Sequence, residues 1–279
     1  MAQGPLSGAA LAVWWVRMMG AWVYVDGFNL YYGALKGRPN KWLDLKQLTL
    51  RLLPHGRAVE KIKYFTARVS GAGDPDAPRR QQAYLNALAT LPEVEIHFGN
   101  FLAKTIWRPL NNLPVAGRQI HSAVPPIVFG SGNHLVSGQR RQTMSVGSYP
   151  TQGQHQGRRR RMPRPLPDAL IVEVHTKEEK GSDVNLAAHL LNDAWKGSFT
   201  EAVVISNDTD LVTPIDMVVT ERKLPVTVVN PQEGSNTAPA LVRAATHDRH
   251  INRPMLSATQ FANPIVLPNG REINKPLDW

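Results

Sequence analysis

The chain of 279 residues contains no cysteine, which excludes disulfide bonds and thiolate metal sites. Any bound metal must therefore use oxygen or imidazole ligands. A cysteine-free chain fits a reducing compartment, and we expect a cytoplasmic protein. No run of 18 apolar residues is present, so we expect no membrane span. The apolar stretch Gly8–Met19 contains Arg17 and follows no basic segment, so we interpret residues 1–18 as an upstream extension and not as a signal peptide.

Acidic residues are missing from one long segment. Between Ile96 and Pro167 there are ten Lys or Arg residues and no Asp or Glu. The chain holds 32 basic and 22 acidic residues, so the remainder carries 22 of each and is formally neutral. The whole net charge of +10 therefore lies in this segment, which predicts an affinity for polyanions.

The same part of the chain has the composition of an insertion. Residues 107–167 are rich in Pro, Gly, Ser, Gln and Arg, and we expect a basic, loop-rich segment that is partly disordered, above all over 152–167. Ile127–Phe129 and His134–Val136 flank a Gly-Ser-Gly-Asn sequence and predict a hairpin.

On either side of this insertion, strand patterns alternate with helix patterns. The expected strands are Ala21–Val25, Ile62–Ala67, Val94–Phe98, Ala169–Val174, Ala202–Ser206 and Val226–Val229. The expected helices are Leu45–Leu53, Asp76–Leu91, Ser182–Trp195, Leu211–Arg222 and Ala240–His250. This alternation predicts an α/β fold, a three-layer α/β/α sandwich with a mostly parallel central sheet, over residues 19–250. Residues 251–279 are expected to form a C-terminal tail.

Acidic residues follow three of the predicted strands. Asp26 ends the first strand in VDGFN, Asp183 opens a helix in KGSDVN, and Asp208 and Asp210 lie in SNDTD. The carboxyl ends of parallel strands meet at one edge of a sheet, so we expect these acids to converge. Clustered carboxylates repel one another unless a cation lies between them, and Mg²⁺ prefers oxygen ligands. The pattern predicts a Mg²⁺ site built from these four residues.

Each motif also has a purely structural interpretation. Asp183 can favour a helix start beside Ser182, Asp208 can cap the helix that begins near Asp210, and Asp26 with the following glycine can form a turn. Taken together, these interpretations require three independent coincidences at one sheet edge. We therefore favour the metal site.

The segments VDGFNLYYG, KGSDVNLAAHLLNDA and VVISNDTDLVTPI resemble, in order and spacing, the three motifs of NYN domains, a branch of the PIN-like ribonucleases. The resemblance covers residues 21–104 and 168–230. It implies a PIN-like fold, one or two Mg²⁺ or Mn²⁺ ions held by acids, and RNA as the substrate. Carried over residue by residue, it implies catalytic roles for Asp26, Asn29, Asp183, Asp208 and Asp210, with Asn29 orienting a ligand or a water molecule.

One position departs from the family pattern. Many relatives carry an acid within the KGSD helix where this chain has His189, which leaves the number of metal ions open. Asp193, one turn further along, is the weaker substitute that we consider. The nine His residues show no zinc-site spacing, so we expect no zinc.

Two groups of basic residues are candidates for RNA contacts. Arg158, Arg159, Arg160, Arg161 and Arg164 can bind the phosphate backbone, and the alternative is a solvated loop. Lys180 can neutralise a phosphate or remain solvated. The aromatic residues Tyr31, Tyr32 and Trp42 are interpreted as core rather than as substrate platforms.

The sequence thus predicts a metal-dependent ribonuclease with RNA as its partner. Two alternatives stay open: an RNA-binding module with a weak or inactive site, which His189 favours, and a different Mg²⁺-dependent phosphohydrolase. The sequence leaves undecided the RNA target, endo against exo cleavage, a homo-oligomer, and an antitoxin-like or RNA-processing partner.

Overall fold

The computed structural model describes residues 20–54, 57–71, 74–109, 127–128, 143–144 and 170–279, and within 101–180 it describes the backbone strands only. The chain divides into two compact units: Met1–Asn100 with Lys180–Trp279, and Phe101–Glu179. The predicted extension 1–18, most of the insertion 107–167, and its five Arg residues lie outside the described residues. In the described part of the chain, no helix is both long and apolar enough to cross a membrane.

The first unit is built on six parallel strands in the order β3-β2-β1-β7-β8-β9. Their bounds are β1 Ala21–Asp26, β2 Val59–Ala67, β3 Val94–Pro109, β7 Glu201–Ile205, β8 Val226–Asn230 and β9 His247–His250. Strand β1 lies inside the sheet, with Val25 opposite Ile205 of β7 and Asp26 opposite Phe65 of β2. The ends of β1, β2 and β7 therefore meet at one edge.

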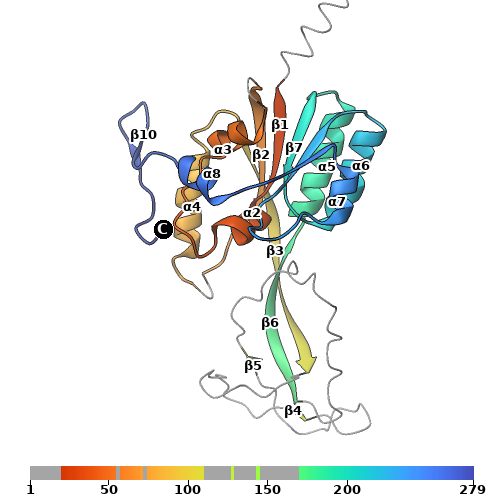
Figure 1. Cartoon of the computed structure of the whole chain (residues 1–279). Coiled ribbons are helices and arrows are strands. Elements are labelled where there is room, and N and C mark those ends of the chain that lie inside the picture. The colour runs from red at the N-terminus through yellow and green to blue at the C-terminus, as the bar shows by residue number, and fades with distance from the viewer. Residues whose placement is uncertain (1–19, 55–56, 72–73, 110–126, 129–142, 145–169) are drawn as a thin grey trace, which may run out of the picture. The chain divides into compact units, whose positions relative to one another are not determined.

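Helices cover both faces of this sheet, as predicted (Figure 1). On one face are α3 (Leu45–Leu52), α4 (Ala77–Leu88) and α8 (Arg253–Ala258); on the other are α5 (Ser182–Trp195), α6 (Val212–Thr220) and α7 (Pro239–Ala244). Side chains of β1 alternate between the two cores: Val23 and Val25 belong to the first, and Tyr24 to the second. The three-layer α/β/α architecture is confirmed.

The chain turns at once into helix after β1, which the sequence pattern did not predict. A four-residue helix α2 (Gly27–Leu30) continues into a π-helical turn η1 (Tyr31–Leu35). A Cβ at Gly27 would lie 2.7 Å from the backbone oxygen of Phe65, so only glycine lets this turn pack so closely on β2. This close packing positions α2 directly over the end of the sheet. Tyr32, in η1, is 36% exposed, so the interpretation of this residue as core is wrong.

The C-terminal part differs from the prediction in two places. Helix α7 ends at Ala244, and His247–His250 forms the edge strand β9 beside β8, not the end of a helix. All four residues of β9 are exposed, so no apolar alternation marks it in the sequence. The predicted tail is folded: α8 packs on the core, β10 (Ile265–Val266) pairs with β11 (Glu272–Ile273), and the Trp42 indole donates to the Ala262 carbonyl at 3.1 Å.

The second unit contains longer strands than the sequence indicated. Strand β3 extends to Pro109, well past the predicted end at Phe98, and β6 covers Leu170–Lys180. Ile127–Val128 forms β4, which pairs antiparallel with β6. The second half of the predicted hairpin, His134–Val136, lies outside the described residues. Thr143–Met144 forms β5, which pairs with β6 in parallel.

Candidate active site

Asp26 is the last residue of β1 and is 4% exposed. Its carboxylate Oδ1 accepts a hydrogen bond from the Asn29 backbone amide at 2.9 Å, which caps helix α2. Its Oδ2 accepts from the Ser206 hydroxyl at 3.0 Å. The structural interpretation of Asp26 and Gly27 as a turn is therefore replaced by a helix cap, and the same carboxylate also contacts the third motif, 180 residues away at Ser206.

The SNDTD motif follows β7 directly. Ser206 is 1% exposed, and its hydroxyl oxygen also accepts from the Asp208 backbone amide at 3.1 Å. Asp208 Oδ1 in turn accepts from the Asp210 amide at 3.0 Å and caps the short 3-10 helix η2 (Thr209–Leu211). One hydroxyl group therefore holds the first and third acidic motifs against each other.

Two asparagine side chains join the surrounding loops. Asn29 Oδ1 accepts from the Asn207 backbone amide at 3.1 Å. The Asn207 side chain donates to Gln232 Oε1 at 3.2 Å and accepts from the Ala238 amide at 2.8 Å. Asn207 thus ties the loop after β8 to the loop after β7, a structural role that the sequence alone left undecided.

The KGSD acid lies at the start of α5, where Gly181 adopts a left-handed conformation with φ of 94°. Asp183 is half-buried in the first turn of this helix. Further along α5, Asp193 contacts Tyr24 in the middle of β1, so α5 runs back over the sheet from its carboxyl edge. The three acidic motifs therefore share one edge of the sheet.

The predicted metal ligands are not assembled as one cluster. Among the residues that the structure describes, no three Asp, Glu or His side chains lie close enough together to hold a metal ion jointly. Hydrogen bonds connect Asp26 with Ser206 and with the backbone of Asn29, and connect Asp208 with the backbone of Asp210. Lys180 is the last residue of β6, and its side chain, like the five Arg residues, lies outside the description.

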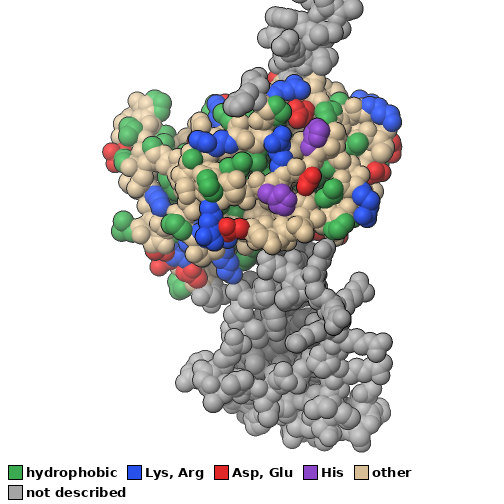
Figure 2. All heavy atoms as spheres, in the orientation of Figure 1, with side chains coloured by type: hydrophobic (Ala, Val, Ile, Leu, Met, Phe, Trp, Pro, Cys, Tyr) green, Lys and Arg blue, Asp and Glu red, His purple; other side chains and the backbone are tan. Residues whose placement is uncertain are grey.

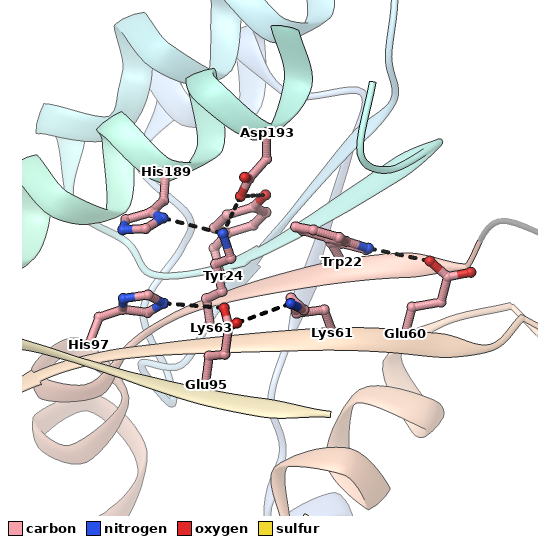
Figure 3. Close-up of polar contacts among 9 residues, drawn as sticks. All are labelled: Trp22, Tyr24, Glu60, Lys61, Lys63, Glu95, His97, His189 and Asp193. Atoms are coloured by element: carbon pink, nitrogen blue, oxygen red, sulfur yellow. Dashed lines mark hydrogen bonds and ion pairs between the residues drawn. The ribbon is translucent and has the colours of Figure 1, made fainter. Parts of the chain in front are cut away.

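A second polar cluster lies between α5 and the sheet (Figure 3), and it was missed by the sequence analysis. The Lys63 ammonium contacts an Asp193 carboxylate oxygen at 2.6 Å and His189 Nδ1 at 3.2 Å. The Tyr24 hydroxyl donates to the same Asp193 oxygen at 2.8 Å. Asp193 is therefore committed to a buried ion pair, and the suggestion that it substitutes for a missing metal ligand is wrong.

Burial and neighbouring charges shift the pKa values in this cluster. Burial lowers the pKa of His189, and the nearby Lys63 lowers it further. The pKa of His97 is also lowered, first by burial and then by His189 and Lys63; the two imidazole rings lie 4.3 Å apart. Burial and the Asp193 carboxylate raise the pKa of the Tyr24 hydroxyl. The only indication of this cluster in the sequence was Lys63, a charged residue within the apolar pattern of the predicted strand Ile62–Ala67.

Comparison with known proteins finds a protein family whose model matches part of this chain. The family model of the NYN domain matches residues 138–252, a range that includes Asp183, Asp208 and Asp210. The chain contains an NYN domain. NYN domains belong to the PIN-like superfamily, a nuclease-like family, so the resemblance drawn from the three motifs is confirmed. The matched range begins after the VDGFN motif, so the family match does not include Asp26. The fold brings Asp26 beside the SNDTD motif, through the hydrogen bond from Ser206.

Two individual proteins are similar over most of the chain. The protein named 6-hydroxy-3-succinoylpyridine 3-monooxygenase HspA, from Pseudomonas putida (strain DSM 28022 / S16), is 29% identical over 277 residues, covering 92% of this chain and 74% of that protein. A crystal structure of a protein of unknown function from Vibrio parahaemolyticus RIMD 2210633 has a TM-score of 0.42 and 14% identity, and covers 84% of this chain and 94% of that one.

Proposed function

We propose that this protein is a metal-dependent ribonuclease that hydrolyses RNA phosphodiester bonds at the carboxyl edge of its sheet. The observation that carries the proposal is the double contact of the Ser206 hydroxyl, with Asp26 and with the backbone of Asp208. A helix cap needs no such link to a distant motif. The link supports a joint role for the two acids.

The chemistry of the donor set fits a hard divalent cation, Mg²⁺ or Mn²⁺. Asp26, Asp208, Asp210 and Asp183 offer carboxylate oxygens at the same sheet edge, and Mg²⁺ commonly keeps several waters and uses only one or two carboxylates. Such an ion lowers the pKa of a bound water and offsets negative charge on a phosphoryl oxygen. Asp26, fixed by two hydrogen bonds, is the residue best held to bind it.

RNA is proposed as the substrate because the positive charge of the chain is concentrated in one segment. In the view of Figure 2, Lys and Arg side chains of the described surface occur in separate groups, and acidic side chains lie between some of them. The acid-free segment Ile96–Pro167 carries ten basic residues. Lys180, Arg158–Arg161 and Arg164 remain predicted phosphate contacts.

A cleavage assay separates this proposal from the alternatives. A labelled single-stranded RNA oligomer and a panel of phosphomonoesters are incubated with the protein and Mg²⁺. Shortened RNA supports the ribonuclease. Turnover of phosphomonoesters alone would point to a different phosphohydrolase, and binding of RNA without cleavage would point to an RNA-binding module with an inactive site.

A second candidate follows from the 29% identity to a named monooxygenase across nearly the whole chain. By its name, that protein is a monooxygenase of 6-hydroxy-3-succinoylpyridine. A reaction of that class here would use O₂ and a reduced nicotinamide or flavin as electron donor, with one oxygen atom passing to the substrate and the other to water. Oxygen uptake that depends on 6-hydroxy-3-succinoylpyridine and the reductant, with no RNA cleavage, would favour this candidate over the ribonuclease.

A further inference from the structure

A small cavity lies at the amino edge of the sheet, at the opposite ends of the strands from the acidic motifs. Its volume is about 210 Å³, and strands β7, β8 and β9 line it together with the residues just before β2. The polar and charged side chains in its lining are Arg57, Glu201, Thr227, His247 and Arg249. The five residues of β7, about 17 Å of extended chain, separate the cavity from the acidic edge.

The register of the strands places this lining on one face of the sheet. Thr227 of β8 pairs with His247 of β9, and Val229 pairs with Arg249, so each pair of side chains points to the same face. Val229 belongs to the core beneath α3, and Pro54, which follows α3, also lines the cavity. The cavity is therefore on the α3 face, beside the edge strand β9.

Two hydrogen-bond donors in the cavity are not used by the folded chain. Thr227 is 4% exposed, yet its hydroxyl makes no hydrogen bond to any residue that the structure describes. The Arg249 side chain is exposed and makes neither an ion pair nor a hydrogen bond within the described part of the chain. A buried hydroxyl without a partner costs free energy, and a ligand that accepts its proton would recover that cost.

The charges in the lining favour an anion. The Arg57 Nε lies 3.5 Å from a carboxylate oxygen of Glu201, whose side chain is 8% exposed, so these two charges offset each other. Arg249 adds a positive charge, and two Arg with one Glu give the lining a formal net charge of +1, with His counted as neutral. Arg57 and Arg249 approach from opposite sides of β7 and β8, so donors surround a ligand in the cavity.

We propose that this cavity binds a single phosphate group through the Arg249 guanidinium and the Thr227 hydroxyl, with Arg57 held on the opposite side by Glu201. Donors on several sides suit a tetrahedral oxyanion, and the guanidinium fork matches phosphate. The cavity is smaller than the roughly 300–1,000 Å³ of pockets that enclose drug-sized ligands, so it suits one group and not a whole nucleotide. The group can be free inorganic phosphate or the terminal phosphate of an RNA chain. Binding here does not depend on the ribonuclease proposed for the other edge.

Isothermal titration calorimetry with inorganic phosphate, at an ionic strength fixed with chloride, tests the site. The wild type should bind one phosphate per chain. Arg249→Gln should weaken binding by about 10- to 150-fold, the scale of a hydrogen bond to a charged group, and Thr227→Val by about 2- to 10-fold. Thr227→Val should not lower the Tm, because its hydroxyl has no partner to lose. The matched control is Arg243→Gln, which removes the same charge from the exposed surface of α7 and should bind phosphate as the wild type does.

A second arm identifies the source of the phosphate. Binding of RNA dodecamers with a 5′-phosphate, a 3′-phosphate or no terminal phosphate is measured in EDTA for the wild type and Arg249→Gln. A preference for one phosphorylated end that Arg249→Gln abolishes would assign the site to RNA ends. Equal binding of the three RNAs, with inorganic phosphate still bound, would assign it to the free ion. The proposal is overturned if neither inorganic phosphate nor a phosphorylated end binds in a way that depends on Arg249.

Discussion

At the scale of single residues, the candidate site depends on how the Asp26 carboxylate is held. Both of its oxygens accept hydrogen bonds, one from the helix that it caps and one from Ser206. A buried carboxylate is costly unless it is paired with donors or with a cation. The first bond caps the helix, and the second joins the carboxylate to the motif that contains Asp208 and Asp210.

Asp208→Asn tests the role of the acidic side chains as metal ligands, because it removes the charge and keeps the shape of the side chain. Asparagine keeps an oxygen for the cap of η2 but removes the charge, so we expect the rate of RNA cleavage to fall by at least about a hundredfold with an unchanged circular dichroism spectrum. Asp216→Asn, an exposed acid on α6, is the matched control and should cleave at the wild-type rate. A folded Asp208→Asn protein within about threefold of the wild-type rate would show that Asp208 is not a ligand.

The histidine pair should make stability depend on pH. The pKa values of His97 and His189 are lowered in the folded protein, so the unfolded chain binds protons more readily, near the ordinary value of about 6.5. The free energy of unfolding should therefore increase as the pH rises toward about 6.5, and this stabilisation should be lost as the pH falls below that value. The groups that face the pair are Lys63, Asp193 and Glu95.

Thermal unfolding between pH 5 and pH 8 measures this dependence. His189→Gln should flatten the rise of Tm with pH, because it removes one of the two groups and the repulsion between them. His247→Gln, on the exposed strand β9, serves as the control and should leave the slope unchanged. An identical slope for His189→Gln and the wild type would contradict this account.

At the scale of elements, the strands and helices of the first unit follow from apolar periodicity. The prediction for α5 agrees with the structure at both ends, because Ser182 and Asp183 mark its start and its apolar residues Leu186 and Leu190 are buried. Helix α2 was not predicted because its four residues are too few for a periodic pattern. Strand β9 was not predicted because an exposed edge strand needs no apolar face.

Side-chain pairs between distant elements could not be predicted from one sequence. Lys63 and Asp193 lie 130 residues apart, and neither has a local signal for the other. The convergence of Asp26 with Asp208 could be predicted, because the carboxyl ends of parallel strands share an edge whatever the details of packing. The serine that links them could not, since its partner depends on the register of β1 and β7.

The Lys63–Asp193 pair anchors α5 on the sheet. Both side chains are about 7% exposed, so removing one partner leaves a buried charge and should cost about 3–5 kcal/mol of unfolding free energy in Lys63→Met or Asp193→Leu. The double variant should be less destabilised than the sum of the two. Arg79→Met, which breaks an exposed pair with Asp76, should cost less than about 1 kcal/mol. Additive single effects in urea unfolding would refute the proposed coupling.

At the scale of the whole molecule, charge and candidate chemistry lie in different parts of the chain. The acids belong to the first unit, whereas the acid-free segment Ile96–Pro167 falls mostly within the second. We expect the segment to supply long-range attraction for RNA and the sheet edge to supply cleavage. Affinity and turnover should therefore respond separately to changes in the two parts.

Deletion of residues 151–165 removes five Arg and no acid. RNA affinity should fall, and its dependence on salt between about 50 and 200 mM should flatten, because fewer counterions are released on binding. Cleavage of saturating RNA should change much less. Deletion of 110–116, an uncharged stretch of the same segment, is the control. Equal salt slopes for the first deletion and the full chain would mean that these Arg residues do not contact RNA.

The most direct test of the metal-dependent ribonuclease is cleavage of single-stranded RNA after removal of divalent metal. Protein treated exhaustively with EDTA should lose cleavage, and Mg²⁺ or Mn²⁺ should restore it in the wild type but not in Asp26→Asn. Restoration in the wild type alone would tie the metal to this carboxylate. Cleavage undiminished by EDTA, or restored equally in Asp26→Asn, would contradict the assignment of the acidic edge as the site of the reaction.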